Sequence, residues 1–175
     1  MTNSKLAAQI DTLEAEMGTD MNYMRAILAG SEASYRNFTR FMAVANHGEA
    51  APEQALILAQ LTAMWSENCR PCFGIVEKFA RAADIPDAWI EAVRHNHGER
   101  LPEDMRFVHA FARAMSLDEP EADQYRRQLE ATFGHAVVVE LTLAVAMARV
   151  YPAVKRGLGY AVALDPERRL VGAAS

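Results

Sequence analysis

Cysteine is scarce in this sequence of 175 residues, which contains only two. Two cysteines cannot build the multi-bridge framework of a small secreted domain, so the fold must be stabilised by a hydrophobic core. An excess of basic charge is also lacking, because 18 Lys and Arg stand against 23 Asp and Glu. This balance disfavours nucleic acid and anionic membranes as partners.

Long hydrophobic runs are missing too. The most apolar stretch, residues 136–150, is interrupted by Glu140 and is too short to span a bilayer. The first 18 residues carry acidic side chains where a signal peptide needs an apolar run. We therefore expect a cytoplasmic protein that does not enter a membrane.

Strand patterns are also lacking, since no stretch alternates apolar and polar residues, whereas helical spacing recurs almost everywhere. Glycine and proline divide the chain into segments of helical pattern, and Pro152 is expected to kink the last. The predicted helices cover residues 6–17, 21–29, 31–47, 53–65, 69–83, 87–94, 103–115, 121–133 and 136–160. The sequence predicts one all-α domain over residues 1–163 and a loosely attached tail over residues 164–175.

Both cysteines lie in one CRPC motif at the start of a predicted helix. With Asn68 as N-cap, Cys69 becomes the first helical residue, and Pro71 falls in the opening turn, where a missing N–H costs nothing. Cys69 and Cys72 then share a helix face near the positive end of the helix dipole, which favours thiolate. A modest adjustment would bring the two thiols to disulfide geometry.

Three other interpretations of the CRPC motif remain open. A zinc site needs about four ligands, and His95 and His97 lack the usual ligand spacing. A thioredoxin-like site needs βαβ units that this chain does not supply. The simplest alternative is a pair of small buried hydrophobes, because free cysteine is among the most buried residue types.

The stretch LTAMWSENCRPCFGIVEKFARAADIPDAWIEAV, with the later FVHAFARAMS and ELTLAVAMARVYPAVKRGLGYA segments, resembles the carboxymuconolactone decarboxylase and alkylhydroperoxidase D-like family. The likeness covers residues 21–161. It implies a single-domain bundle of about eight helices that forms homo-oligomers and needs no organic cofactor or metal. In the redox branch of this family, a CxxC motif reduces peroxides through a disulfide cycle. The resemblance implies that Cys72 attacks the peroxide and Cys69 resolves it.

The chain departs from the family pattern at the proton-relay positions. The family's glutamate, twelve residues before the CxxC, corresponds to Ile57, and its histidine, four residues after the second cysteine, corresponds to Val76. A histidine that some members carry just before the second cysteine is Pro71. None of these three side chains can act as a general base.

Glutamates nearby are the candidate substitutes for this relay: Glu53, Glu67 and Glu77. The function expected from the resemblance is a thiol-disulfide oxidoreductase with weak alkyl hydroperoxide reductase activity, recycled by an unidentified reductant. The alternative is a helical oligomer of the same fold that has lost the relay and works without this catalysis.

Other residues near the motif are expected to be structural. Aromatic and methionine side chains at helical spacing are usually core, which here concerns Met64, Trp65, Phe73 and Phe79. His109 is expected on a helix surface or at an interface. The segments 53–65 and 136–160 are apolar nearly all round, and this predicts a homo-oligomer that covers them.

Overall fold

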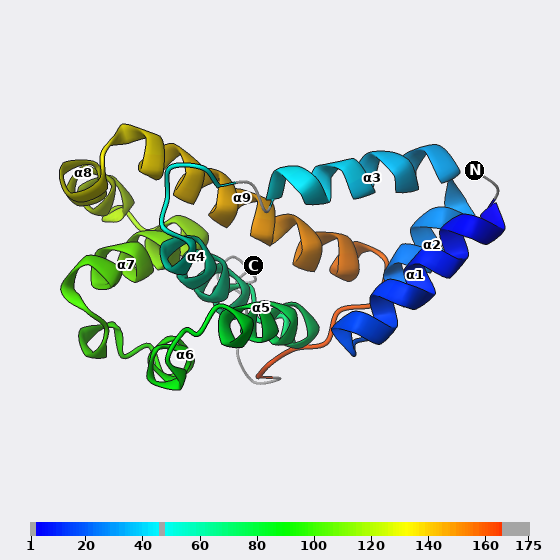
Figure 1. Ribbon diagram of the computed structural model, residues 1–175, viewed down its shortest axis with the longest axis horizontal. Coiled ribbons are helices and arrows are strands. Elements are labelled where there is room, and N and C mark those ends of the chain that lie inside the picture. The colour runs from blue at the N-terminus through cyan, green and yellow to red at the C-terminus, as the bar shows by residue number, and fades with distance from the viewer. Residues whose placement is uncertain (1–2, 46–47, 166–175) are drawn as a thin grey trace, which may run out of the picture.

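The described residues, 3–45 and 48–165, form helices joined by short turns in the computed structural model (Figure 1). The prediction of an all-α fold in one domain is confirmed for this part of the chain. In chain order the α-helices are α1 (Asn3–Met17), α2 (Asn22–Gly30), α3 (Glu32–Ala45), α4 (Glu53–Ser66), α5 (Arg70–Ala82), α6 (Asp87–Arg94), α7 (Glu103–Leu117), α8 (Ala122–Phe133) and α9 (His135–Gly157). A short 3₁₀ helix, Gly98–Arg100, precedes α7.

Proline marks the start of three of these helices. Pro52, Pro86 and Pro102 are the residues directly before α4, α6 and α7. Proline suits a helix start because the first amides have no partner within the helix. These local signals explain why the predicted boundaries agree closely with the observed ones. Residues 46 and 47, where the third predicted segment ends, lie outside the described residues.

The last helix and the predicted tail differ from expectation. α9 continues through Pro152 and ends at Gly157, three residues before the predicted end at Tyr160. In the predicted tail, Leu164 donates its backbone N–H to Asn68 O, and the Asp165 backbone N–H bonds the Asn68 side chain. The rest of that tail, residues 166–175, lies outside the described part of the chain.

The main hydrophobic core surrounds α4, which packs against α5, α6, α7 and α9. α4 is apolar on all sides, and its Leu58 and Leu61 side chains are fully buried. Within the described residues, α9 is the one helix long and apolar enough to cross a membrane, with 39% of its most apolar window buried in the protein. α9 is longer than residues 136–150, the apolar stretch that the sequence analysis judged too short to span a bilayer. α9 also packs against α3, α4, α7 and α8.

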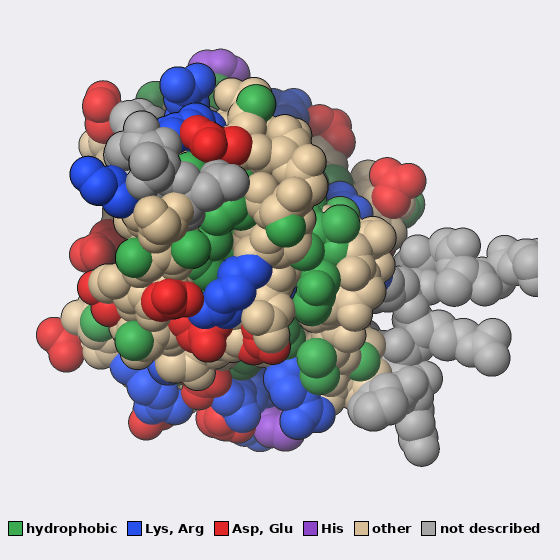
Figure 2. Space-filling view, turned by 90° about the vertical axis from the view of Figure 1, so that its right-hand side faces the viewer, with side chains coloured by type: hydrophobic (Ala, Val, Ile, Leu, Met, Phe, Trp, Pro, Cys, Tyr) green, Lys and Arg blue, Asp and Glu red, His purple; other side chains and the backbone are tan. Residues whose placement is uncertain are grey.

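The first three helices build a second hydrophobic cluster at the opposite end of the molecule from α8 (Figure 1). This cluster includes Tyr23 and Tyr35 and meets the rest of the fold at Ile75 of α5 and Val154 of α9. Figure 2 shows this end: hydrophobic side chains gather in the middle of the face, and charged side chains crowd its lower edge. The boundary between the two clusters is where the candidate site lies.

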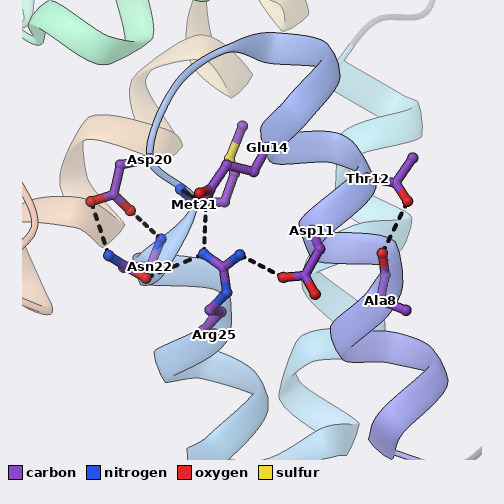
Figure 3. A network of polar contacts seen from close by, with 8 residues as sticks. All are labelled: Ala8, Asp11, Thr12, Glu14, Asp20, Met21, Asn22 and Arg25. Carbon is purple, nitrogen blue, oxygen red and sulfur yellow. Dashed lines mark hydrogen bonds and ion pairs between the residues drawn. The ribbon is translucent and has the colours of Figure 1, made fainter.

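A polar network fixes the corner between α1 and α2 (Figure 3). The Arg25 guanidinium binds Asp11 at 2.6 Å and also pairs with Glu14, whose carboxylate accepts the Met21 backbone N–H at 3.0 Å. The hydrogen bond from Arg25 holds the pKa of Glu14 below its usual value. This network positions Met21 and Tyr23, which both face the candidate site.

Candidate functional site

The two cysteines form a disulfide at the start of α5, with their Cα atoms 5.3 Å apart. The expectation that Asn68 caps this helix is wrong, because Cys69 itself is the N-cap and α5 begins at Arg70. Asn68 has a left-handed backbone with φ of 53°, and its side-chain amide bonds Asp165 instead of the first turn of α5. Pro71 lies in the first turn, as predicted.

A C-terminal strap, residues 160–165, covers the Cys69 side of the disulfide. Cys69 pairs with Ala163 in an isolated antiparallel bridge, and the Arg70 N–H donates to Val162 O at 2.9 Å. The Arg70 guanidinium also donates to the carbonyl oxygens of Ala163 and Leu164. In Figure 1 this segment turns back beneath α5 after α9 ends. The strap therefore occupies Arg70 and lies against Cys69, which is 3% exposed, and we expect it to limit access of reductants to the Cys69 sulfur.

Cys72 faces the other way, into a cavity of about 100 Å³ between the two hydrophobic clusters. We call this the thiol cavity. Its wall is mostly apolar and comes from α1–α5, α9 and the turn before α2, with these lining residues: Leu13, Met17, Met21, Tyr23, Met42, Gln60, Met64, Cys72, Ile75, Val76, Phe79, Ala148, Tyr151 and Lys155. Cys69 is not among them, so only one of the two cysteines lines this cavity.

The polar residues of the thiol cavity were not found by sequence reasoning. They are Tyr23 from α2, Gln60 from α4, and Tyr151 and Lys155 from α9. Burial raises the pKa of Tyr151 to about 12 and also raises the pKa of Tyr23, so both phenols are neutral at physiological pH. A basic residue in the last turn of a helix is usually solvated and interacts with the helix dipole. The sequence position of Lys155 therefore gave no sign that this residue is buried.

Lys155 is unusual because a cation is buried with little to balance its charge. The residue is 2% exposed, and its Nζ lies 4.6 Å from the centre of the Tyr23 ring. Burial lowers the pKa of Lys155 to about 8, against a smaller opposing effect of Asp20. No carboxylate among the described residues forms an ion pair with this ammonium.

The three candidate relay glutamates lie outside the lining of the thiol cavity. Glu53 is exposed at the start of α4 and lines a second cavity together with Ile57. Glu77 pairs with Arg81 at 2.9 Å and Arg94 at 2.7 Å, facing α6. The structure thus brings neither Glu53 nor Glu77 into the cavity that Cys72 lines.

Glu67 lies two residues before Cys69 but is held by α9. Its carboxylate oxygens accept from Arg149 Nε and Arg156 Nη2, each at 2.7 Å, and its backbone oxygen accepts from Arg156. Glu67 is 8% exposed. With both oxygens engaged, it ties the turn before α5 to α9, and this fixes the position of the CRPC motif.

The two positions that the family resemblance assigns to the relay glutamate and histidine, Ile57 and Val76, line different cavities. Val76 lies one helical turn after Cys72 and lines the same thiol cavity, whereas Ile57 lines only the second cavity. The neighbouring aromatic and methionine residues also divide. Trp65 and Phe73 pack edge to face with ring centres 5.5 Å apart, as expected. Met64 belongs to the main core, also as expected, and in addition lines the thiol cavity. Phe79 lines the cavity too but is 39% exposed, so its expected place in the core is wrong.

His109 is buried, so its expected place on a helix surface or at an interface is wrong. Its Nδ1 lies 3.0 Å from Thr62 Oγ1, and that hydroxyl donates to Leu58 O. Nδ1–H is therefore the donor to Thr62. Burial lowers the pKa of His109 to about 4, so the ring is neutral. Gly98 permits this packing, because a Cβ there would lie 2.8 Å from the His109 ring.

Within residues 3–45 and 48–165, no group of three or more His, Cys, Asp or Glu side chains is placed to hold a metal ion. The chain gives no significant match to protein-family models, to curated proteins or to solved structures. The disulfide, the thiol cavity and the strap therefore define the chemistry available at the site.

Replacing Asn68 by glycine is expected to speed reduction of the disulfide by dithiothreitol about tenfold. Glycine accepts the left-handed backbone but removes the two side-chain bonds to Asp165, at 2.8 and 2.9 Å, that hold the strap. Each such bond contributes about 1 kcal/mol, so their loss raises the population in which Cys69 is uncovered. Stopped-flow reduction kinetics measure the effect.

The matched control is Asn96→Gly, because Asn96 also has a left-handed backbone but does not contact the strap. This control should reduce at the wild-type rate. Equal rates for wild type and Asn68→Gly would show that the strap does not limit access.

Proposed function

We propose that this protein is a thiol-disulfide oxidoreductase of the alkylhydroperoxidase D-like type, with slow alkyl hydroperoxide reductase activity. One observation carries the proposal: Cys69 and Cys72 form a disulfide, and Cys72 alone opens onto an apolar cavity. This asymmetry fits the division of roles that the family resemblance implies. The all-α fold and the order of its helices are also compatible with that family.

The proposed reaction begins from the reduced dithiol. The Cys72 thiolate attacks the distal oxygen of a hydroperoxide, the O–O bond breaks, and the alcohol leaves after taking up a proton. Cys72 becomes a sulfenic acid. The Cys69 thiol attacks that sulfur, forms the disulfide and releases water. An external dithiol then returns two electrons by thiol-disulfide exchange.

Slow turnover is expected because the cavity lacks a carboxylate or imidazole beside Cys72. Val76 occupies the position one turn beyond the thiol, and Glu53, Glu67 and Glu77 lie elsewhere. A positioned acid or base typically contributes about 10²–10⁴-fold to such a step.

The test is single-turnover oxidation of the reduced protein by tert-butyl hydroperoxide. Wild type should consume one equivalent and form the disulfide. Cys72→Ser should lose the reaction by about 10²-fold or more, because the attacking sulfur is absent. Cys69→Ser should still react once, but it should stop at the sulfenic acid, which mass spectrometry detects. If Cys72→Ser reacts as fast as wild type, the assigned roles are wrong.

The alternative is a helical oligomer of the carboxymuconolactone decarboxylase-like fold without this catalysis. It is supported by the burial of both cysteines, each 3% exposed, and by the apolar residues at the relay positions. Equilibration in glutathione buffers separates the two proposals. A catalytic pair should interconvert between dithiol and disulfide at physiological potentials, whereas a structural pair should stay in one state.

We also propose that a second copy of the chain covers part of α9. Val139 and Leu143 are 43% and 40% exposed, and Met147 and Val150 continue this stripe at helical spacing. The sequence pattern predicts two helices that are apolar nearly all round, α4 and α9. Other helices of the same chain cover α4. The α9 stripe therefore leaves hydrophobic surface for an interface.

Leu143→Glu is expected to weaken self-association at least 10²-fold, because an unpaired carboxylate would be buried at the interface. Light scattering at micromolar concentration should show an oligomer for wild type and a monomer for the variant. Ala131→Glu on the exposed face of α8 is the matched control and should leave the oligomer intact. A monomeric wild type would contradict the proposal.

A further inference from the structure

The thiol cavity combines an apolar wall with one buried cation. Burying an ammonium without an anionic partner is costly, and proteins usually pair such a charge. Lys155 has the Tyr23 ring as its near neighbour, which attracts a cation more weakly than a carboxylate does. Because Tyr23 and Tyr151 are neutral, only the smaller effect of Asp20, among the described residues, opposes the cost of burying the Lys155 charge.

The dimensions of the cavity suit a small ligand. Its enclosed volume is about 100 Å³, smaller than the apolar cavity of about 150 Å³ that holds benzene in another protein, so a longer chain would extend from it toward the opening at Phe79. The rest of the wall carries methionine and aliphatic side chains, including Met42, Met64 and Ile75, which would pack against a short alkyl chain. Phe79 lines both this space and the second cavity and is 39% exposed, so the wall reaches the surface there.

We propose that the thiol cavity binds a small monocarboxylate with a short apolar body. The carboxylate lies on the Lys155 ammonium, and the apolar body lies among the methionines, close to Cys72. A neutral ligand would leave the charge unbalanced, and a purely polar anion would leave the apolar wall unfilled. If the proposed function holds, the preferred peroxide substrate is a short hydroperoxide that carries a carboxylate.

Binding is tested on the oxidised protein, so that no thiol chemistry takes part. Hexanoate and hexan-1-ol, which have equal chain length, are titrated at pH 7 and followed by protein NMR. Wild type should bind hexanoate at least tenfold more tightly, since a hydrogen bond to a charged group adds about 10- to 100-fold. Lys155→Met should abolish this preference. Lys5→Met, which removes an exposed charge on α1, should retain it.

A second measurement needs no variant. Hexanoate affinity of wild type should fall at least fivefold between pH 7 and pH 10, as Lys155 loses its proton. Of the other groups that face Lys155, Tyr23 and Tyr151 stay neutral over this range because burial raises the pKa of each phenol, and Cys72 is in the disulfide. Asp20 is the acidic residue whose charge acts on Lys155. Hexan-1-ol affinity should not change with pH.

Equal affinity for hexanoate and hexan-1-ol, or hexanoate binding unaffected by Lys155→Met, would overturn the proposal. This result is separate from the test of function. If tert-butyl hydroperoxide oxidises the dithiol but hexanoate does not bind, the proposed oxidoreductase function stands and the proposed carboxylate site is wrong. If hexanoate binds but the thiols do not react, the proposed site stands and the proposed peroxidase function is wrong.

Discussion

Replacing Val76 by histidine is expected to raise the rate of Cys72 oxidation by a hydroperoxide about 10- to 100-fold. Val76 is one helical turn beyond Cys72, is 5% exposed and lines the same cavity. An imidazole there would be neutral at pH 7, because burial lowers the pKa of histidine, and it could accept the thiol proton. The gain stays at the low end of general-base catalysis because no carboxylate among the described residues lines the cavity to orient the ring.

Single-turnover stopped-flow oxidation of reduced Val76→His by tert-butyl hydroperoxide measures this gain. Val76→Phe is the control for side-chain size, since it introduces a ring without a nitrogen. Its rate should not exceed that of wild type. A folded Val76→His that reacts no faster than Val76→Phe would show that one base at position 76 is not sufficient.

Lys155→Met is expected to stabilise the protein by about 2 kcal/mol at pH 7. In the folded state, burial lowers the pKa of Lys155 from 10.5 to about 8. The unfolded chain therefore binds more protons between these pH values, and stability rises with pH across this window. Methionine removes the cost of burying the charge and keeps an apolar contact with the Tyr23 ring.

Urea unfolding at pH 7 and pH 10.5 measures this effect, which should correspond to an increase in Tm of about 4–8 °C at pH 7. The advantage of Lys155→Met should nearly vanish at pH 10.5, where wild-type Lys155 is neutral. Lys5→Met should have little effect at either pH, because Lys5 is exposed. A loss of stability at pH 7 would mean that Lys155 holds the fold together and is not kept at a stability cost for binding.

The order and limits of the helices could be predicted because their signals are local. Prolines at positions 52, 86 and 102 each precede a helix, and the apolar spacing between such signals repeats with the helical period. The one wrong cap, Asn68, is engaged by Asp165, which lies 97 residues further along the chain. A contact at that separation leaves no local signal in the sequence.

The candidate site divides in the same way. The sequence by itself determined the CRPC motif, the i, i+3 placement of its thiols at a helix start and the absence of ionisable residues at positions 57, 71 and 76. Only the tertiary structure decided that Cys72 meets a cavity while Cys69 lies beneath a strap, and that Lys155 shares the cavity. Helical periodicity shows which residues share a face of one helix, but the thiol cavity is lined by α5 and α9 together, and their own patterns do not specify that these distant segments share it.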